Sequence, residues 1–229
     1  MHGCTLQCVT RANSDDGAAT ATRAQRKEQT RQQLLDATLE LSRDRGFAAV
    51  SLREITKSVG IVPTAFYRHF KSVDELGLAI VDEGIRELRL TLRAVRRNPA
   101  PADAARSMDV LFEHVRNKRE LFRFLFRERY GGSREVTAAI ASELRLIVRE
   151  LATDLSRVPA LDTWSDDDLD MTAGLFVAVV QDGIADFVSV AEPDGRADGY
   201  SAAEKAIVER AVRQLRLVML GMGGWRPRA

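Results

Sequence analysis

The sequence predicts an all-α protein, with a small N-terminal domain of three helices followed by a larger helical domain, about nine helices in total. Two observations support this. Between Ser51 and Lys71 the residues indicate two short helices joined by a tight turn, which is a helix-turn-helix. From Asp103 to Arg157 no strand-like alternation interrupts the helical spacing of apolar residues. We expect a tail at residues 1–22, the DNA-binding domain at 23–71 and a helical ligand-binding and dimerisation domain at 72–229.

Charge is distributed unevenly along the 229 residues. The formal net charge is only +1, but residues 23–71 contain ten Lys or Arg against five Asp or Glu. A basic segment attached to a near-neutral body is typical of a DNA-binding module joined to another domain.

Residues that favour helix ends mark the helix-turn-helix. Ser51 and Glu54 have the spacing of a capping box, which starts a helix ahead of an apolar run. Gly60 ends that helix, since glycine tolerates the left-handed backbone that the turn needs. Pro63 suits the first turn of the next helix, which we expect to run to about His69.

The second of these helices has one apolar and one polar face. Phe66 and Phe70 lie four residues apart and are expected to pack inward. A helix in the major groove contacts base edges with its first turns and phosphates with hydroxyl, imidazole and cationic groups. The predicted phosphate contacts are Thr64, Tyr67, His69 and Lys71; the predicted base contacts are Arg53, Pro63, Ala65 and Arg68; Ser51, Arg23 and Arg26 complete the predicted DNA-binding set. The alternative is a helical hairpin that only packs, with Tyr67 and Arg68 as ordinary surface residues.

These residues resemble those of a known family. The pair Gly46-Phe47, the segment SLREI at 51–55 and the segment GIVPTAFYRHF at 60–70 are similar to the entry, turn and recognition helix of the TetR family of transcriptional regulators. The segment from Arg26 to Glu40 resembles the first helix of that family.

A closer resemblance is to the branch that represses unsaturated fatty acid synthesis genes, the FabR and DesT type. It rests on RAQRKEQTR near Arg23, PTAFYRHFKSVDELGLAIVDE from Pro63 and FRFLFRERYGGS from Phe122, and is strongest up to Ser133. This resemblance implies a homodimeric repressor that binds an inverted repeat in double-stranded DNA. It also implies that long-chain acyl-CoA or acyl carrier protein acts as effector, and that a long helix after Lys71 carries the ligand signal to the DNA-binding domains.

The N-terminal part of the chain carries weaker signals. Residues 1–22 are small and polar, without an apolar run that a signal peptide or membrane span requires, so we expect a disordered tail and a cytoplasmic protein. His2, Cys4 and Cys8 lack a second pair of ligands for zinc, and two free thiols in a reduced cytosol are the favoured interpretation.

The first helix is expected from about Ala24 to Arg45. Arg23 and Arg26 would lie at its start, where positive charge opposes the helix dipole, so contact with the DNA backbone would explain them. A solvated surface is the alternative.

The body of the chain offers apolar volume. Three Phe fall within five residues at 122–126, and other aromatic residues precede and follow them. We predict an apolar cavity for a chain-like ligand, with Arg129 at its mouth. Its predicted residues are Phe112, Phe122, Leu125, Phe126, Arg129, Phe176 and Val180. A plain packed core is the alternative.

Two later helices are expected to form the dimer interface. The helix that begins after Ser165 carries small residues along one side, and the last helix, from about Ser201 to Gly221, has a near-heptad apolar seam. The predicted interface residues are Gly174, Ala178, Ala185, Val208, Leu215 and Val218. The alternative is that the seam packs within its own chain.

The motifs that organise enzymatic chemistry are missing. We find no G-x-S-x-G, H-E-x-x-H, P-loop or C-x-x-C motif, so no catalytic, metal or cofactor residue is predicted. The resemblance to the FabR and DesT type implies a repressor of unsaturated fatty acid synthesis or desaturase genes. The alternatives are a TetR-type regulator of an efflux or degradation operon that responds to a lipophilic compound, and a small lipid carrier that binds acidic membranes.

Overall fold

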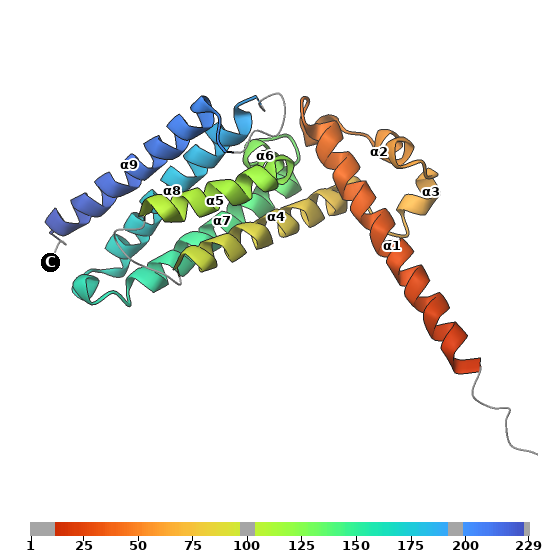
Figure 1. Cartoon of the computed structure of the whole chain (residues 1–229), viewed down its shortest axis with the longest axis horizontal. Coiled ribbons are helices and arrows are strands. Elements are labelled where there is room, and N and C mark those ends of the chain that lie inside the picture. The colour runs from red at the N-terminus through yellow and green to blue at the C-terminus, as the bar shows by residue number, and fades with distance from the viewer. Residues whose placement is uncertain (1–11, 97–103, 192–198, 227–229) are drawn as a thin grey trace, which may run out of the picture.

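The computed structural model describes residues 12–96, 104–191 and 199–226. Within these ranges it contains nine α-helices, two short 3-10 helices and no strand, which confirms the predicted all-α fold (Figure 1). The α-helices, in chain order, are α1 (Ala12–Ser42), α2 (Leu52–Val59), α3 (Pro63–Phe66), α4 (Val73–Arg96), α5 (Ala104–Asn117), α6 (Arg119–Glu128), α7 (Arg134–Leu155), α8 (Asp166–Ser189) and α9 (Ala202–Gly224). The 3-10 helices are η1 (Phe47–Ala49) and η3 (Pro159–Leu161).

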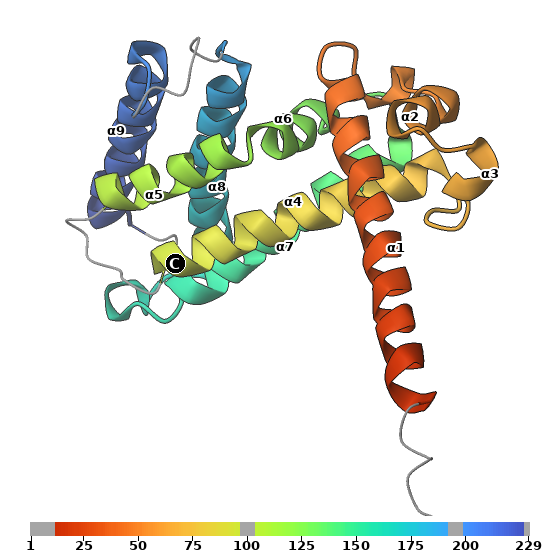
Figure 2. The ribbon, with the colours of Figure 1, turned by 45° about the vertical axis from the view of Figure 1, so that its right-hand side comes forward.

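The helices form two groups that α4 joins. Helices α1, α2 and α3 lie around the start of α4, and α5 to α9 form the body (Figures 1 and 2). Of the body helices, α5, α6 and α7 pack against α4. Within the body, α7 packs against α4 and α8, and α8 packs against α6 and α9. One apolar core runs through both groups, from Leu34 and Phe66 through Ile80 of α4 to Phe122. A movement of α4 therefore affects the packing of both groups.

Helix α1 differs from the sequence prediction at both ends. It begins at Ala12 rather than near Ala24, and it ends at Ser42, with residues 43–45 forming a turn. The stretch from Ala12 to Thr22, predicted to be disordered, is therefore helical, in line with the high helix propensity of its several alanines. His2, Cys4 and Cys8 lie outside the described residues.

The helix-turn-helix forms from the signals in its own sequence. The capping box is present: the Ser51 N–H donates to Glu54 Oε2 at 3.0 Å, and the Glu54 N–H donates to Ser51 Oγ at 3.3 Å. Gly60 caps the end of α2 with a left-handed φ of 74°. Helix α3 is shorter than predicted and ends at Phe66, because the N–H groups of Arg68 and His69 bond to carbonyls three residues back and tighten the last turn.

Two close approaches fix α4 between the two groups. A Cβ atom added at Gly77 would lie 2.6 Å from Phe47 Cζ of η1, and one added at Gly84 would lie 2.5 Å from Leu125 Cδ1 of α6. Only residues without side chains fit at these points. Helix α4 therefore touches Phe47 of the DNA-binding group and Val136 of α7 at Gly77, and touches α6 at Gly84.

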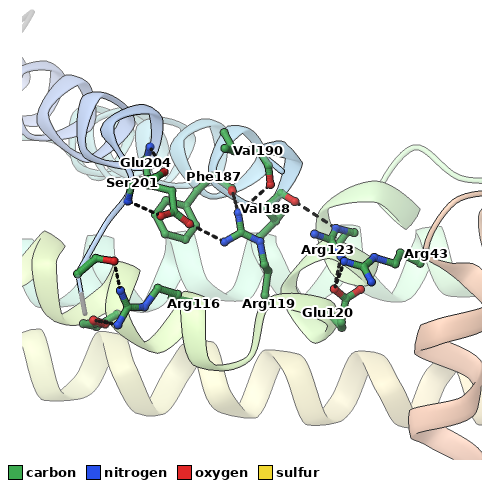
Figure 3. Close-up of polar contacts among 12 residues, drawn as sticks. Arg43, Arg116, Arg119, Glu120, Arg123, Phe187, Val188, Val190, Ser201 and Glu204 are labelled. Carbon is green, nitrogen blue, oxygen red and sulfur yellow. Dashed lines mark hydrogen bonds and ion pairs between the residues drawn. The ribbon is translucent and has the colours of Figure 1, made fainter. Parts of the chain in front are cut away.

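A buried ion pair fixes α6 against α8 and α9 (Figure 3). Arg119 Nη1 lies 2.8 Å from Glu204 Oε1, and these two residues are only 6% and 1% exposed. Arg119 also donates to the carbonyl oxygens of Phe187 at 2.6 Å and Val190 at 2.9 Å, near the end of α8. Buried charges are stable only when they are paired and hydrogen-bonded. The network of Arg119 therefore holds the first residue of α6 against the end of α8 and the start of α9.

Helix α8 is the one described helix that is long and apolar enough to cross a membrane, judged by length and composition. Here it packs against α5, α6, α7 and α9. Core helices of soluble proteins satisfy the same criterion, so length and composition are weak evidence for a membrane span.

Candidate nucleic-acid interface and effector cavity

The exposed face of α2 and α3 presents most of the predicted DNA-binding side chains. Six are solvent-exposed and Ala65 and His69 are partly buried. The exposed residues are Arg53, Pro63, Thr64, Tyr67, Arg68 and Lys71. Phe66 and Phe70 are buried, as predicted, and so fix which side of α3 points outward.

Ser51 has a structural role at the start of α2. Its hydroxyl accepts the N–H of Glu54 and donates to Glu54 Oε2 at 2.7 Å. Hydrogen bonds from the hydroxyl and N–H of Ser51, together with Arg45 at 2.8 Å, lower the pKa of Glu54 to about 2. Ser51 therefore contributes to the interface mainly by fixing α2, whose first turn carries Arg53.

His69 sits between α1 and the end of the recognition helix. Burial, followed by the nearby charges of Lys27, Arg31 and Arg68, lowers its pKa, so the ring is neutral at pH 7. Its Nδ1 atom is buried and has no hydrogen-bond partner among the described residues. A phosphate contact from His69 would therefore come from a neutral imidazole, and the positive charge beside it comes from Lys27 and Arg31 of α1.

Helix α1 contributes cations to the same end of the molecule. The Arg31 guanidinium lies 5.0 Å from the ring centre of Phe70, which ties α1 to the segment after α3. Arg23 and Arg26 are exposed, as a phosphate contact requires. They lie in the middle of the longer α1 and not in its first turn, so the helix-dipole argument made for them from the sequence is wrong.

An apolar cavity of about 200 Å³ lies inside the body. Helices α4 to α9 all contribute to its wall, and within the described part of the chain only Ser107 and Gln181 bring polar side chains to it. The remaining lining residues are Leu88, Leu92, Met108, Phe126, Leu144, Ile147, Leu151, Phe176, Val177, Val180, Ile184, Leu215 and Met219. Such a wall suits a hydrocarbon ligand.

Three of the seven predicted ligand residues line this cavity, namely Phe126, Phe176 and Val180. Phe112, Phe122 and Leu125 do not. The ring of Phe112 packs 5.2 Å from that of Phe187, Phe122 lies 5.9 Å from the ring of His114, and Leu125 packs against Gly84. The triple-Phe segment is buried on several sides, as expected, but only Phe126 faces the cavity.

Arg129 lies just behind the cavity wall. Its Nη1 donates to Oε1 of Gln181, a lining residue, and its guanidinium stacks 4.5 Å from the ring centre of Tyr130. The cavity residues that the sequence prediction missed, among them Leu88, Met108 and Leu144, have the pattern of ordinary core residues, and no local signal distinguishes them.

The structure places the six predicted dimer-interface residues in different environments. Val208 and Leu215 are buried within the chain, where α9 packs on α5 and α8, as expected if the seam packs within its own chain. Ala185 also packs against this core, and Val218 is partly buried. Gly174 and Ala178 do lie toward the surface of α8: a Cβ at Gly174 would meet nothing within 4 Å, and Ala178 is exposed.

Other apolar side chains on α8 and α9 are exposed instead. Met171 is 45% and Leu175 49% exposed on α8, and Leu217 is 71% and Leu220 78% exposed on α9. Their spacing of three and four residues places each pair on one side of its helix. Among the described residues, no group of three or more His, Cys, Asp or Glu side chains has the arrangement of a metal site.

A basic helix-turn-helix joined by one long helix to a helical body with an apolar cavity defines a DNA-binding regulator with a small-molecule site. Residues 34–80 match the model of bacterial regulatory proteins of the tetR family, and residues 103–217 match that of the tetracyclin repressor-like C-terminal domain. The chain belongs to the TetR family of transcriptional regulators. Members of this family are soluble DNA-binding proteins, in general not enzymes, and typically bind DNA and small-molecule ligands as dimers.

Solved structures show the same fold at low sequence identity. A transcriptional regulator from Aquifex aeolicus VF5 is similar with a TM-score of 0.62 and 16% identity, covering 82% of this chain and 99% of its own. A TetR-family regulator from Syntrophomonas wolfei has a TM-score of 0.64 and 11% identity, and the match covers 84% of this chain and 96% of that regulator. The Thermus thermophilus repressor FadR, solved with lauroyl-CoA, has a TM-score of 0.55 and 19% identity, and the match covers 87% of this chain and 97% of FadR.

Proposed function

We propose that the protein is a homodimeric repressor whose operator affinity is set by a long-chain acyl thioester, acyl-CoA or acyl carrier protein, and that it controls unsaturated fatty acid synthesis or desaturase genes. The observation that carries the effector class is the composition of the cavity wall, in which Ser107 and Gln181 are the only polar residues among those that the structure describes. A long hydrocarbon chain gains free energy from leaving water for such a wall, whereas a polar effector would leave its hydrogen bonds unmade.

Helix α4 supplies the connection between effector and DNA. Leu88 and Leu92 of α4 line the cavity, while Gly77, three turns earlier, touches Phe47 of the DNA-binding group. A ligand alters DNA binding only as far as it binds two positions of α4 with different affinity. Saturated and unsaturated chains differ in shape, so we expect them to favour different positions.

The exposed apolar side chains of α8 and α9 supply the dimer interface in this proposal. The side chains of Met171, Leu175, Leu217 and Leu220 would be buried by a second copy of the chain, with Gly174 and Ala178 allowing the helices to approach closely. A two-fold dimer places its two recognition helices in successive major grooves, about 34 to 36 Å apart, so the operator is an inverted repeat.

The fatty acid branch of the proposal has two supports. One is the sequence resemblance to the FabR and DesT type. The other is that the FadR repressor from Thermus thermophilus, similar in fold, was solved with lauroyl-CoA. A wall of hydrocarbon also suits other lipophiles, which favours a regulator of an efflux or degradation operon as the second candidate.

Operator affinity measured by fluorescence anisotropy tests the proposal. The DNA comes from the promoter of a neighbouring desaturase or fatty acid synthesis gene, and saturated and unsaturated acyl-CoA are added in turn at fixed salt, because phosphate contacts make affinity depend on salt. We expect the two acyl types to shift the affinity in opposite directions. If neither acyl type alters specific DNA binding but unrelated lipophiles weaken it, the acyl effector is refuted. The second candidate, a regulator of an efflux or degradation operon, then takes its place.

Arg53→Ala tests the DNA interface in the same assay. Loss of a bidentate base contact is expected to cost about 1 to 3 kcal/mol at the cognate operator and to relax one operator position. An equal loss on all DNA sequences would show that Arg53 contacts only the backbone.

A further inference from the structure

Helices α8 and α9 carry opposite charges. Helix α8 contains six aspartates and no Lys, Arg or His. Helix α9 contains four Lys or Arg and two glutamates, and one of these, Glu204, is buried in its ion pair with Arg119. The exposed surface of α8 is therefore acidic, and that of α9 is basic.

One charged residue on each helix shares a side with the exposed apolar residues. Asp182 of α8 follows Leu175 by seven residues and is exposed. Arg213 of α9 is also exposed and precedes Leu217 by four residues and Leu220 by seven. Residues at these spacings lie on one face of a helix. We call the surface formed by Leu175, Asp182, Arg213, Leu217 and Leu220 the α8–α9 face.

Contacts at both ends show that α8 and α9 run antiparallel. Arg210, in the first half of α9, pairs with Asp186 near the end of α8. Trp225, just after α9, donates from Nε1 to Asp168 Oδ1 near the start of α8 at 3.0 Å. The end of α8 therefore lies beside the first half of α9.

Asp182 and Arg213 lie at this same end of the α8–α9 face and are incompletely paired within the chain. Arg210 Nη2 lies 4.0 Å from Asp182, but the same nitrogen makes a hydrogen bond to Asp186. Arg213 has no ion pair with any residue that the structure describes. An exposed anion of α8 and an exposed cation of α9 are thus both available to a partner.

We propose that the α8–α9 face binds a second copy of the chain with α8 of each copy against α9 of the other, so that Asp182 of one copy meets Arg213 of its partner. The inference rests on the homodimer of the proposed function, and it adds which helices meet and why a second copy is the preferred partner. Packing of α8 against α8 would bring aspartates together with no cation on either helix. Like charges across an interface oppose association, whereas complementary charges select the partner.

DNA binding requires an arrangement that brings these two charges together. Both recognition helices of a dimer must reach the same operator, so the two DNA-binding groups lie at the same end of the dimer. Residues 43–44 of the DNA-binding group and residues 188–191 line one hollow, so the end of α8 points toward the DNA-binding group. A two-fold axis that keeps these ends together places Asp182 level with the partner's Arg213, and it forms the contact twice.

Exchange of the two charges tests the inference. Arg213→Asp and Asp182→Arg each place like charges in both symmetric contacts. We expect each variant to raise the dimer dissociation constant about a hundredfold, about tenfold for each contact. Arg145→Asp, the same change at an exposed position of α7, is the matched control and should leave this constant unchanged. Sedimentation of the full-length chain over a dilution series measures the constant, and circular dichroism verifies that each variant is folded.

A mixture of the two variants gives the decisive result. When a chain with Arg213→Asp pairs with a chain with Asp182→Arg, opposite charges meet again at both contacts. We therefore expect the heterodimer to exceed its share in random pairing, as measured by native mass spectrometry, which separates the heterodimer from the two homodimers. Because the restored contacts join different chains, changes in packing within one chain cannot produce this preference.

The outcomes separate this inference from the proposed function. If neither variant weakens the dimer, or if the mixture forms no excess of heterodimer, the pairing of α8 with α9 is overturned and the homodimer stands. A preference of Asp182→Arg for wild-type chains would overturn it in favour of α8 against α8. A wild type that stays monomeric overturns the homodimer of the proposed function as well.

Discussion

Removal of Arg119 is predicted to be the most damaging single change to the stability of the body. Arg119→Met leaves the carboxylate of Glu204, 1% exposed, without its cation, and leaves the carbonyls of Phe187 and Val190 without their donor. Breaking a buried ion pair in this way costs about 3 to 5 kcal/mol. Arg157→Met, which removes a solvent-exposed pair with Asp154, is the matched control and is expected to cost about 1 kcal/mol or less.

The double variant Arg119→Met with Glu204→Leu isolates the reason for that loss. With both charges gone no carboxylate is left unpaired, so the double variant should be more stable than Arg119→Met alone by about 2 kcal/mol or more. It should remain below the wild type, because Glu204 also accepts the Ser201 N–H in the capping box of α9. Urea unfolding followed by circular dichroism, at one protein concentration because a dimer unfolds in a concentration-dependent way, measures each free energy.

The same ion pair gives a pH signature. Burial alone would raise the pKa of Glu204, but hydrogen bonds from Ser201 and Arg119 outweigh it and lower that pKa below 4.5. The ionised Glu204 carboxylate therefore contributes fully to the free energy of unfolding above its unfolded pKa of 4.5. This contribution is lost as the pH falls through the lower pKa of the folded state. The double variant should lack this portion of the acid sensitivity. If Arg119→Met costs no more than Arg157→Met, or if Arg119→Met and Glu204→Leu destabilise additively, the account of the pair is refuted.

Three further changes test other parts of the molecule. Gly60→Ala should lower the free energy of unfolding by about 1 kcal/mol, because a residue with a side chain is strained at a φ of 74° even though nothing crowds the position. Gly60→Asn should cost less, because asparagine tolerates the left-handed backbone better. Equal losses in the two variants would contradict a backbone cause. Gly84→Ala should cost about 1 to 3 kcal/mol, because its Cβ would overlap Leu125, and a neutral result in urea unfolding would show that α4 and α6 separate freely. Leu220→Glu should convert the dimer to monomer in sedimentation and abolish tight operator binding, and an unchanged dimer would move the interface elsewhere.

The sequence predicted best where the relevant signals lie close together along the chain. The capping box of Ser51 and Glu54, the turn at Gly60 and the inward Phe66 and Phe70 all appear in the structure as expected. Boundaries were less accurate: α1 begins at Ala12 because alanine continues a helix where composition suggested a tail, and α3 ends at Phe66 because its last turn tightens.

The cavity and the outer faces of α8 and α9 were predicted less well. Apolar residues at helical spacing indicate that a helix is buried without saying against what, so Phe112 and Phe122 could not be distinguished from Phe126. For the same reason the apolar seam of α9 does not indicate by itself that Val208 and Leu215 pack against α5 and α8 within the chain.

The sequence by itself therefore determined the helical fold, the helix-turn-helix and the chemistry of its exposed face, because caps, turns and helix faces depend on residues within a few positions of one another. Only the tertiary structure decided which side chains surround the cavity, which apolar residues of α8 and α9 remain exposed, and that Arg119 meets Glu204 in a buried ion pair. Those arrangements depend on how helices far apart in the sequence cross and pack, and no local pattern encodes that geometry.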